Sequence, residues 1–143
     1  MRIMQRLFWG IGLCVLLGGC SEGTQLETAP VRGTVIYNGK PLPYGSVSFQ
    51  PAAGLPAVGR IQSDGSFTLT TYSNGDGAII GSHKVAIIAT EIDAGATPPA
   101  DPHGEMPPPK SVIPAKYASY ATSGLTAEVV GGKKNEFTFT LQN

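Results

Sequence analysis

Short runs of alternating apolar and polar residues, separated by turn-forming residues, recur along most of this chain. The last run places Phe137, Phe139 and Leu141 on one face at a period of two. Asn38-Gly39, which fits the two central positions of a tight hairpin turn, follows an earlier run. Such alternation is typical of half-buried β-strands, and no long helical period competes with it. The sequence therefore predicts an all-β domain.

Seven strands of this kind are expected, at spacings of roughly eight to twelve residues, which is typical of a two-sheet antiparallel sandwich. They cover residues 31–37, 46–50, 57–62, 67–71, 81–89, 125–129 and 136–141. We expect hairpins between the first and second, the third and fourth, and the last two of these strands. The fifth strand is apolar on both faces toward its end and is expected to be central. Between residues 91 and 109 the pattern stops, and repeated prolines predict a long Pro-rich loop.

The first twenty residues have the pattern of an export signal. Arg2 and Arg6 precede an almost wholly apolar run from Leu7 to Leu17, and two glycines then lead to Cys20. The run is too short to span about 30 Å of hydrocarbon comfortably. The ending Leu-Gly-Gly-Cys resembles the bacterial lipobox, which implies cleavage before Cys20 and a diacylglycerol on its sulfur. The protein would then be lipid-anchored in a cell membrane or outer membrane, facing the periplasm or the exterior. The alternative is an ordinary secretory peptide with an incidental cysteine.

Removal of residues 1–19 from the 143-residue chain leaves 124 residues, which suits one domain. We expect a tether over residues 20–30 and a sandwich domain over residues 31–143, present as a monomer. The mature chain would keep eight basic and ten acidic residues, a net charge of −2, which leaves no basic surface for nucleic acid. Cys14 leaves with the signal and Cys20 would be acylated, so no disulfide is expected. Stability must then come from packing.

Five short motifs follow one another in the order typical of a known family. They are Val-x-Gly-x-Val from Val31, Asn-Gly-Lys-Pro-Leu-Pro from Asn38, Val-x-Phe from Val47, Ser-Asp-Gly-Ser-Phe from Ser63 and Gly-x-His-x-Val from Gly81. Up to Ala89 the chain resembles the carboxypeptidase regulatory-like domains, which implies a transthyretin-like (prealbumin-like) sandwich. Two later segments, Ile-Pro-Ala-Lys-Tyr and Thr-Ser-Gly-Leu-Thr-Ala-Glu-Val, resemble the C-terminal half of small bacterial lipoproteins built on that domain.

The motifs that carry this resemblance are turns and core positions, so it implies a fold and no activity. The transthyretin-like fold also includes a purine-pathway hydrolase with paired histidines and a C-terminal Tyr-Arg-Gly-Ser signature. This chain ends in Phe-Thr-Leu-Gln-Asn instead. That activity is therefore not expected here.

The sequence offers no convincing catalytic or metal-binding set. His83 shares a face with apolar strand residues and is expected to pack in the sandwich. His103 lies between Asp101 and Glu105 in the Pro-rich loop, where three flexible groups are poorly pre-organised for a metal ion. Asn74–Gly77 lacks the ligand series and the closing glutamate of an EF-hand and is expected to be a turn. Because no Gly-x-Ser-x-Gly elbow is present either, we expect neither an enzyme nor a cofactor.

Lys116, Tyr117 and Tyr120 are the candidate contacts for a ligand or partner. Aromatic side chains beside an irregular loop stack on sugar rings or on a partner's side chains. The alternative is that Tyr117 closes the open end of the sandwich, with its hydroxyl bonded to a loop carbonyl. The residue pattern alone leaves both interpretations open.

We interpret the chain as a non-catalytic, lipid-anchored module of the cell envelope with a structural or protein-interaction role. Its partners would be the membrane, through Cys20, and an envelope protein or glycan. The alternative, a carbohydrate- or peptidoglycan-binding module, requires coplanar exposed aromatics among Tyr44, Tyr72, Tyr117 and Tyr120. An enzyme would require His83 and an acidic residue to converge in a pocket.

Overall fold

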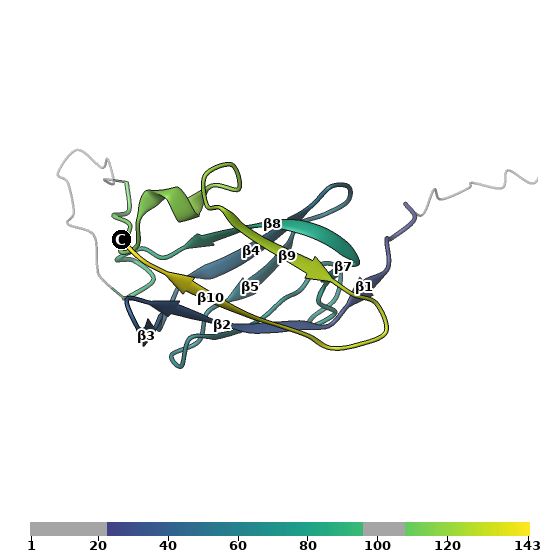
Figure 1. Cartoon of the computed structure of the whole chain (residues 1–143), viewed down its shortest axis with the longest axis horizontal. Coiled ribbons are helices and arrows are strands. Elements are labelled where there is room, and N and C mark those ends of the chain that lie inside the picture. Colours follow the sequence, from purple (N-terminus) through teal and green to yellow (C-terminus); the bar gives the residue numbers. More distant parts are fainter. Residues whose placement is uncertain (1–22, 96–107) are drawn as a thin grey trace, which may run out of the picture.

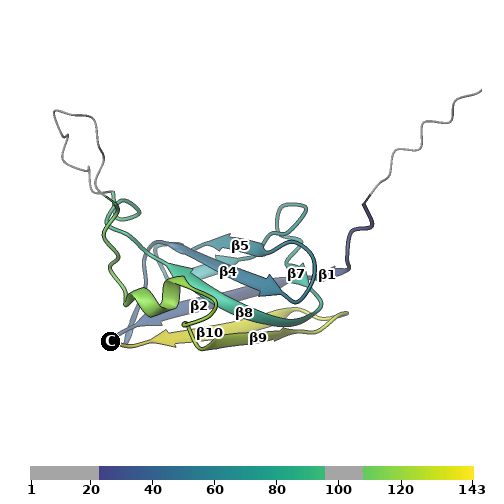
Figure 2. The same cartoon turned by 90° about the horizontal axis from the view of Figure 1, so that it is seen from above.

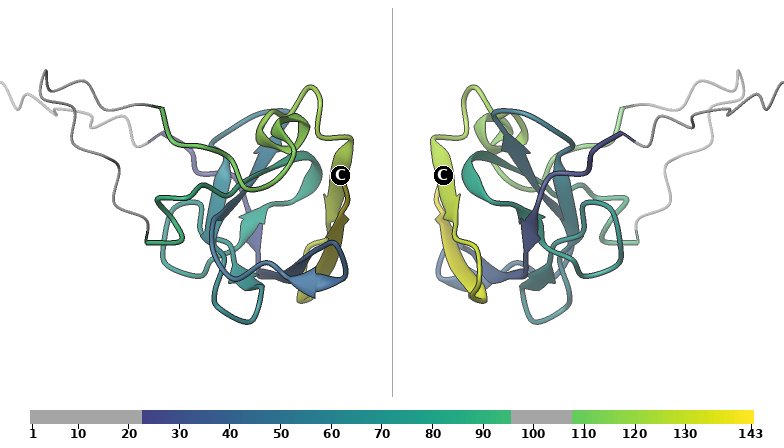
Figure 3. Two further views of the ribbon diagram at one scale, coloured as in Figure 1. Left: turned by 90° about the vertical axis from the view of Figure 1, so that its left-hand side faces the viewer. Right: turned by 90° about the vertical axis from the view of Figure 1, so that its right-hand side faces the viewer.

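The fold is an all-β sandwich, in a computed structural model that describes residues 23–95 and 108–143. Two four-stranded sheets share one core, and Figure 3 shows the strands around it from the two ends. The described residues form ten strands, three of them only two residues long, and one 3₁₀ helix, η1 (Ala115–Ala118). All seven strands expected from the alternation are present. The predicted signal segment, Cys20 and most of the Pro-rich loop lie outside the described residues.

The first sheet consists of β10 (Asn135–Leu141), β2 (Val31–Tyr37), β3 (Lys40–Pro41) and β6 (Ser66–Thr68). Asn38 and Gly39 both have positive φ, at 49° and 79°, and reverse β2 into β3 as a tight turn requires. The prediction that residues 46–50 form the return strand of this hairpin is wrong. The return strand is β3, which is short because prolines at positions 41 and 43 donate no ladder hydrogen bond.

The second sheet has the order β5 (Ala57–Arg60), β4 (Ser46–Pro51), β8 (Gly81–Ile88) and β9 (Leu125–Val129), antiparallel throughout. The interior position predicted for β8 is confirmed. The predicted hairpin between residues 57–62 and 67–71 forms only in part, because the main ladder of β5 is with β4 and that of β6 is with β2. The two segments share a single bridge, between Val58 and Thr70. The turn between them carries the chain from one sheet to the other, which buries side chains of both segments in the same core.

The expected hairpin between the last two strands is also replaced by a crossing between sheets. β10 pairs with β2 in parallel, from Asn135 opposite Val31 to Leu141 opposite Tyr37. The buried side-chain amide of Asn135 holds the connection, because its Oδ1 accepts the N–H of Val130 at 2.9 Å and its Nδ2 donates to the Val130 carbonyl at 3.0 Å. These bonds take the place of ladder bonds between β9 and β10, which run next to each other in Figure 2.

An aromatic cluster fills the middle of the core. The ring of Phe49 lies 6.5 Å from that of Phe67, 5.7 Å from that of Phe137 and 5.9 Å from that of Phe139, between ring centroids. Gly33 makes room for it, because a Cβ at this position would lie 2.5 Å from Phe67 Cζ. Phe139 is buried and Phe137 half-buried, so the predicted core face of the last strand is confirmed. Further core residues are Val31, Val35, Val47, Leu69, Ile87 and Leu141.

The domain begins earlier than residue 31. β1 (Thr28–Ala29) pairs antiparallel with β7 (Ala78–Ile79), and Ala29 is only 2% exposed. The last part of the predicted tether therefore belongs to the fold, and a two-residue strand is too short to show a period in sequence. Within the described ranges, no helix is long and apolar enough to cross a membrane.

The strands follow the long axis of the molecule, so the connections gather at two ends (Figure 1). The β1 end, where the chain continues toward residue 22, contains β1 and the connections at residues 52–56, 71–77 and 130–134. The β3 end contains residues 38–45, the segments 89–95 and 108–114, and the C-terminus.

Candidate functional site

A groove of about 470 Å³ lies at the β3 end. Two tyrosines, two prolines and a lysine line it, together with one residue that follows the Pro-rich loop. These lining residues are Tyr37, Lys40, Pro41, Pro43, Tyr44 and Val112. We call this site the end groove.

The loop that builds the end groove is fixed by its local sequence. Leu42 is buried, and its N–H donates to the carbonyl of Val35 at 2.9 Å. Pro41 and Pro43 flank it, and each ring fixes φ near −65°. The two prolines are exposed, so the loop presents rigid apolar surface on both sides of an inserted leucine.

The polar groups of the groove come from Tyr37 and Lys40. The Tyr37 hydroxyl donates to Oδ1 of Asn143 at 2.5 Å, and its ring is half-buried against the core. Lys40 is exposed and makes no ion pair with any residue that the structure describes. The groove thus combines aromatic and proline surface with one solvated cation.

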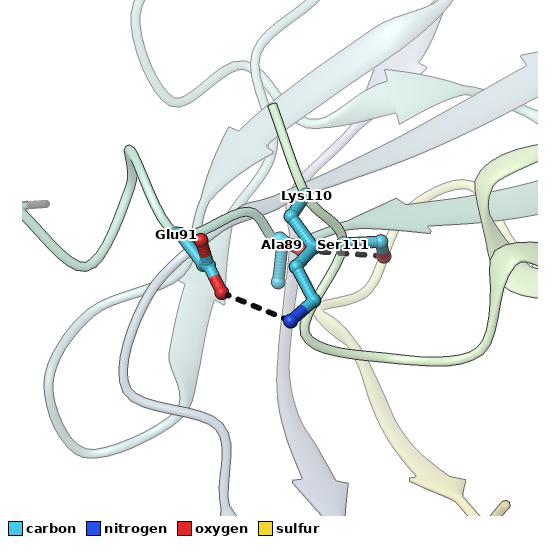
Figure 4. A network of polar contacts seen from close by, with 4 residues as sticks. All are labelled: Ala89, Glu91, Lys110 and Ser111. Carbon is cyan, nitrogen blue, oxygen red and sulfur yellow. Dashed lines mark hydrogen bonds and ion pairs between the residues drawn. The ribbon is translucent and has the colours of Figure 1, made fainter. Parts of the chain in front are cut away.

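The two segments that flank the Pro-rich loop pair with each other beside the end groove. Thr90 and Ser111 form an antiparallel bridge, and the N–H of Glu91 donates to the Lys110 carbonyl at 3.0 Å. Figure 4 shows the Glu91 carboxylate facing the Lys110 ammonium, 3.6 Å apart. These side chains are 50% and 79% exposed, and such pairs contribute only about 0 to 1 kcal/mol. The intervening residues 96–107, with His103, Asp101 and Glu105, lie outside the described residues.

Tyr117 belongs to the core, which supports the second interpretation of this residue. Its ring is 7% exposed, and its hydroxyl donates to the Gln142 carbonyl at 3.0 Å and accepts the Gln142 N–H at 3.1 Å. Lys116 Nζ lies 5.0 Å from the centre of this ring. The Tyr120 hydroxyl bonds the Ser48 hydroxyl on the outer face of the second sheet. The three candidate residues therefore do not combine into one exposed binding surface.

The four tyrosines considered for stacking on sugars are also separated. Tyr72 lies at the β1 end, where its hydroxyl accepts the N–H of Leu26 at 3.2 Å, whereas Tyr44 lines the end groove. With Tyr117 buried, they form no common platform. Sequence reasoning missed Tyr37, Lys40 and the two prolines as a site. The sequence signal for this site is the Asn-Gly-Lys-Pro-Leu-Pro motif, which by itself predicts a turn and not a binding surface.

His83 packs inside the sandwich, as predicted. It is 3% exposed, its ring lies 5.6 Å from that of Phe49 between centroids, and its Nε2 is 2.6 Å from the Ile79 carbonyl oxygen. The nearby Glu128 is exposed and accepts a hydrogen bond from the Ser82 hydroxyl. That pair lines an open hollow of about 670 Å³, and His83 is also among the lining residues of this hollow. The His83 side chain is nevertheless buried and bonded at the Ile79 carbonyl, whereas Glu128 is exposed and bonded to Ser82, so the two side chains have separate hydrogen-bond partners among the described residues.

Asp76 organises the turn at the β1 end. Its carboxylate accepts the N–H groups of Thr71, Tyr72 and Ser73 at 2.7, 2.9 and 3.0 Å. Burial raises the pKa of Asp76, but these hydrogen bonds lower it by more, so that it falls below its ordinary value of 3.8. The prediction of a turn is confirmed. No cluster of three or more potential metal ligands occurs in the described part of the chain.

Asp64 organises the turn between β5 and β6. The hydroxyl of Ser66 donates to its Oδ1 at 2.6 Å and the N–H of Ser66 at 2.9 Å. The pKa of this exposed carboxyl group is lowered, and the bond from the Ser66 hydroxyl is the largest cause. Both acidic turns thus use their carboxylates to bind the chain's own N–H and O–H groups.

Comparison with known proteins gives little further information. No protein-family model matches the chain, and no curated protein matches it. Among solved structures, a 9R-lipoxygenase from Cyanothece is similar over 82% of this chain and 16% of that chain, with 12% identity and a TM-score of 0.42. The chain thus spans about one sixth of that protein's length. A likeness at this score carries no argument about function.

Proposed function

We propose that this protein is a non-catalytic, lipid-anchored module of the cell envelope that binds another envelope protein through the end groove. In this proposal Cys20 carries the lipid and the monomeric domain faces the periplasm or the exterior. The supporting observation is the position of the groove. It lies at the β3 end, whereas the chain continues toward Cys20 from the opposite end.

The lining residues favour an extended peptide segment as the part of the partner that binds. Tyrosine and proline side chains provide flat, rigid surface, and grooves lined in this way accept extended apolar segments. Lys40 favours an acidic residue in that segment. Because Lys40 is exposed, we expect its pairing to set the orientation and register of the peptide, and a reversed charge at this position to repel an acidic segment and keep it out of the groove.

A carbohydrate- or peptidoglycan-binding role is the alternative, and the positions of the tyrosines favour the protein partner instead. A sugar platform needs several exposed, coplanar aromatic rings. Tyr117 is buried in the core, and Tyr72 lies at the opposite end from Tyr44. The resemblance to carboxypeptidase regulatory-like domains fits an interaction module as well, and it remains a prediction.

The proposal is tested by photo-crosslinking in cells of the source organism. A photoreactive amino acid replaces Tyr44 in the groove or, as a control, Thr138, which is exposed on β10. We expect a protein adduct from position 44 and none from position 138.

The adduct should disappear in a Lys40→Glu background and persist in Lys84→Glu, which makes the same charge change at an exposed position on β8, away from the groove. Identical adducts from both positions, or an adduct that survives Lys40→Glu, would contradict the proposal. Protection of position 44 by purified peptidoglycan fragments would favour the carbohydrate-binding alternative.

A further inference from the structure

The β1 end exposes several large apolar side chains. Leu26, Leu55 and Val130 are 42%, 55% and 42% exposed. Gly54 connects the first two, because a Cβ built on it would lie 2.9 Å from Leu26 Cδ1. Ile80 extends the surface to the loop at residues 130–134, since its Cδ1 would lie 2.7 Å from a Cβ on the following glycine, residue 131.

A shallow hollow of about 360 Å³ runs through this surface, between Leu26 and Ile80. Single exposed apolar side chains are common on proteins, and the β3 end has them too, at Ile88 and Ile92. At the β1 end the exposed apolar residues lie at the point where the N-terminal chain joins the domain. We call this set of residues the β1-end surface.

Two lysines lie at the edge of the β1-end surface. Lys133 and Lys134 are exposed in the connection between β9 and β10. Acidic residues also lie at this end of the domain. Glu136 lies opposite Arg32 in the β10–β2 register and Glu27 lines the hollow, while Glu128 accepts a hydrogen bond from Ser82 and Asp76 binds the N–H groups of its own turn. Apolar side chains next to lysines are the combination that binds the headgroup region of anionic membranes.

The length of the N-terminal chain restricts which end of the domain meets a membrane. Six residues lead from Cys20 to Leu26. An extended chain covers at most about 3.6 Å per residue, so this segment spans about 20 Å. A lipid on Cys20 therefore keeps Leu26 within that distance of the headgroups, and the β1 end is the one that faces the bilayer.

We propose that the β1-end surface docks directly on the lipid surface. Leu55 and Val130 enter the headgroup region, and Lys133 and Lys134 bind lipid phosphates. Each contact is weak, but tethering raises the local concentration of lipid so that weak contacts suffice. The inference rests on the proposed lipid anchor and adds a fixed orientation, in which the end groove points away from the membrane.

The test compares the labelling rates of single cysteines in the full chain, on washed membrane fragments with both faces accessible. The mature protein has no free thiol if Cys20 is acylated, so Leu55→Cys and Val130→Cys each introduce a single reactive site. Ile92→Cys is the matched control, because Ile92 is 44% exposed at the β3 end. With a membrane-impermeant maleimide we expect positions 55 and 130 to react at least about 5-fold more slowly than position 92.

Two further measurements distinguish protection by the membrane from protection by neighbouring residues of the protein. Detergent extraction should equalise the three rates, and adding Lys133→Glu with Lys134→Glu should restore labelling of position 55 while the protein stays on the membrane. Equal rates in intact fragments, or protection that survives detergent, would overturn the docking. Loss of the anchor is recognised separately, because an unacylated Cys20 would be labelled in the unmodified protein.

Discussion

The two ends of the sandwich are closed by different kinds of interaction. At the β1 end, backbone pairing of β1 with β7 and the hydrogen bonds of Asp76 and Asn135 hold the connections tightly. At the β3 end, inserted side chains such as Leu42 and Tyr117 close the core, and a groove stays open between the connections. The connections at the β1 end are therefore held in one geometry by hydrogen bonds. The β3 end has a groove in which a partner could bind.

The sharpest way to break the β1 end is Gly77→Ala. Gly77 has φ of +89°, and a Cβ there would lie 1.8 Å from the carbonyl oxygen of Ala29, so β1 must move away. We expect a loss of about 3 kcal/mol or more in the free energy of unfolding, measured by denaturant melts. Gly75→Ala is the matched control, with φ of +75° and no atom within 4 Å, and should cost about 1 kcal/mol. Equal costs would contradict a close contact between this turn and β1.

Asp76→Asn tests the hydrogen bonds of the same turn and their dependence on pH. The amide keeps one acceptor oxygen where the carboxylate offers two, so we expect a loss of about 1 to 2 kcal/mol at pH 7. Because the folded pKa is below 3.8, the carboxylate's stabilisation is complete above the unfolded pKa and is lost as the pH falls through the folded pKa. Melts at pH 7 and pH 3 should therefore show a smaller difference between variant and parent at pH 3. A pH-independent difference would contradict this role.

At the β3 end, Tyr117→Phe removes the hydroxyl that bonds Gln142 and keeps the buried ring. We expect a loss of about 1 kcal/mol in thermal or denaturant melts, with crosslinking through the end groove unchanged. If stability stayed the same while crosslinking disappeared, Tyr117 would return to its other interpretation, as a contact for the partner.

The smallest expected effect is that of Lys110→Ala, which removes the ion pair between the two arms of the Pro-rich loop. Both side chains are at least half exposed, so we expect a change below about 0.5 kcal/mol. A loss above about 1.5 kcal/mol in the same melts would show that this pair helps to close the β3 end.

Local patterns predicted the strands but not their partners. The alternation around Phe137 and Phe139 identified β10 and its buried face, because that pattern depends only on neighbouring residues. Its parallel pairing with β2 depends on where the chain crosses between sheets. That crossing is held by the side chain of Asn135, a residue that also forms ordinary turns. Likewise, β1 has only two residues and shows no alternation in the sequence. Its pairing with Ile79 is visible only in the folded chain.

The candidate site was harder to predict than the fold for the same reason. Tyr37 and Lys40 lie on either side of a turn, and Val112 is distant in sequence, so only the folded chain brings them together. Tyr117 was recognised as important, and its burial required knowing that η1 directs it toward Gln142. Turn motifs that carry exposed aromatic and proline residues were the available signal for the groove.

The roles proposed for the two ends depend most on the proposed lipid anchor at Cys20. Membranes from cells that produce the parent, Cys20→Ala and Cys14→Ala proteins are washed with salt and carbonate, and the protein is quantified in the membrane and soluble fractions. We expect Cys20→Ala to be released, because two or three acyl chains would hold the mature protein and each buried methylene contributes about 0.8 kcal/mol. Cys14→Ala, whose cysteine leaves with the signal, should stay on the membrane. Retention of Cys20→Ala after these washes would contradict the lipid anchor and the orientation built on it.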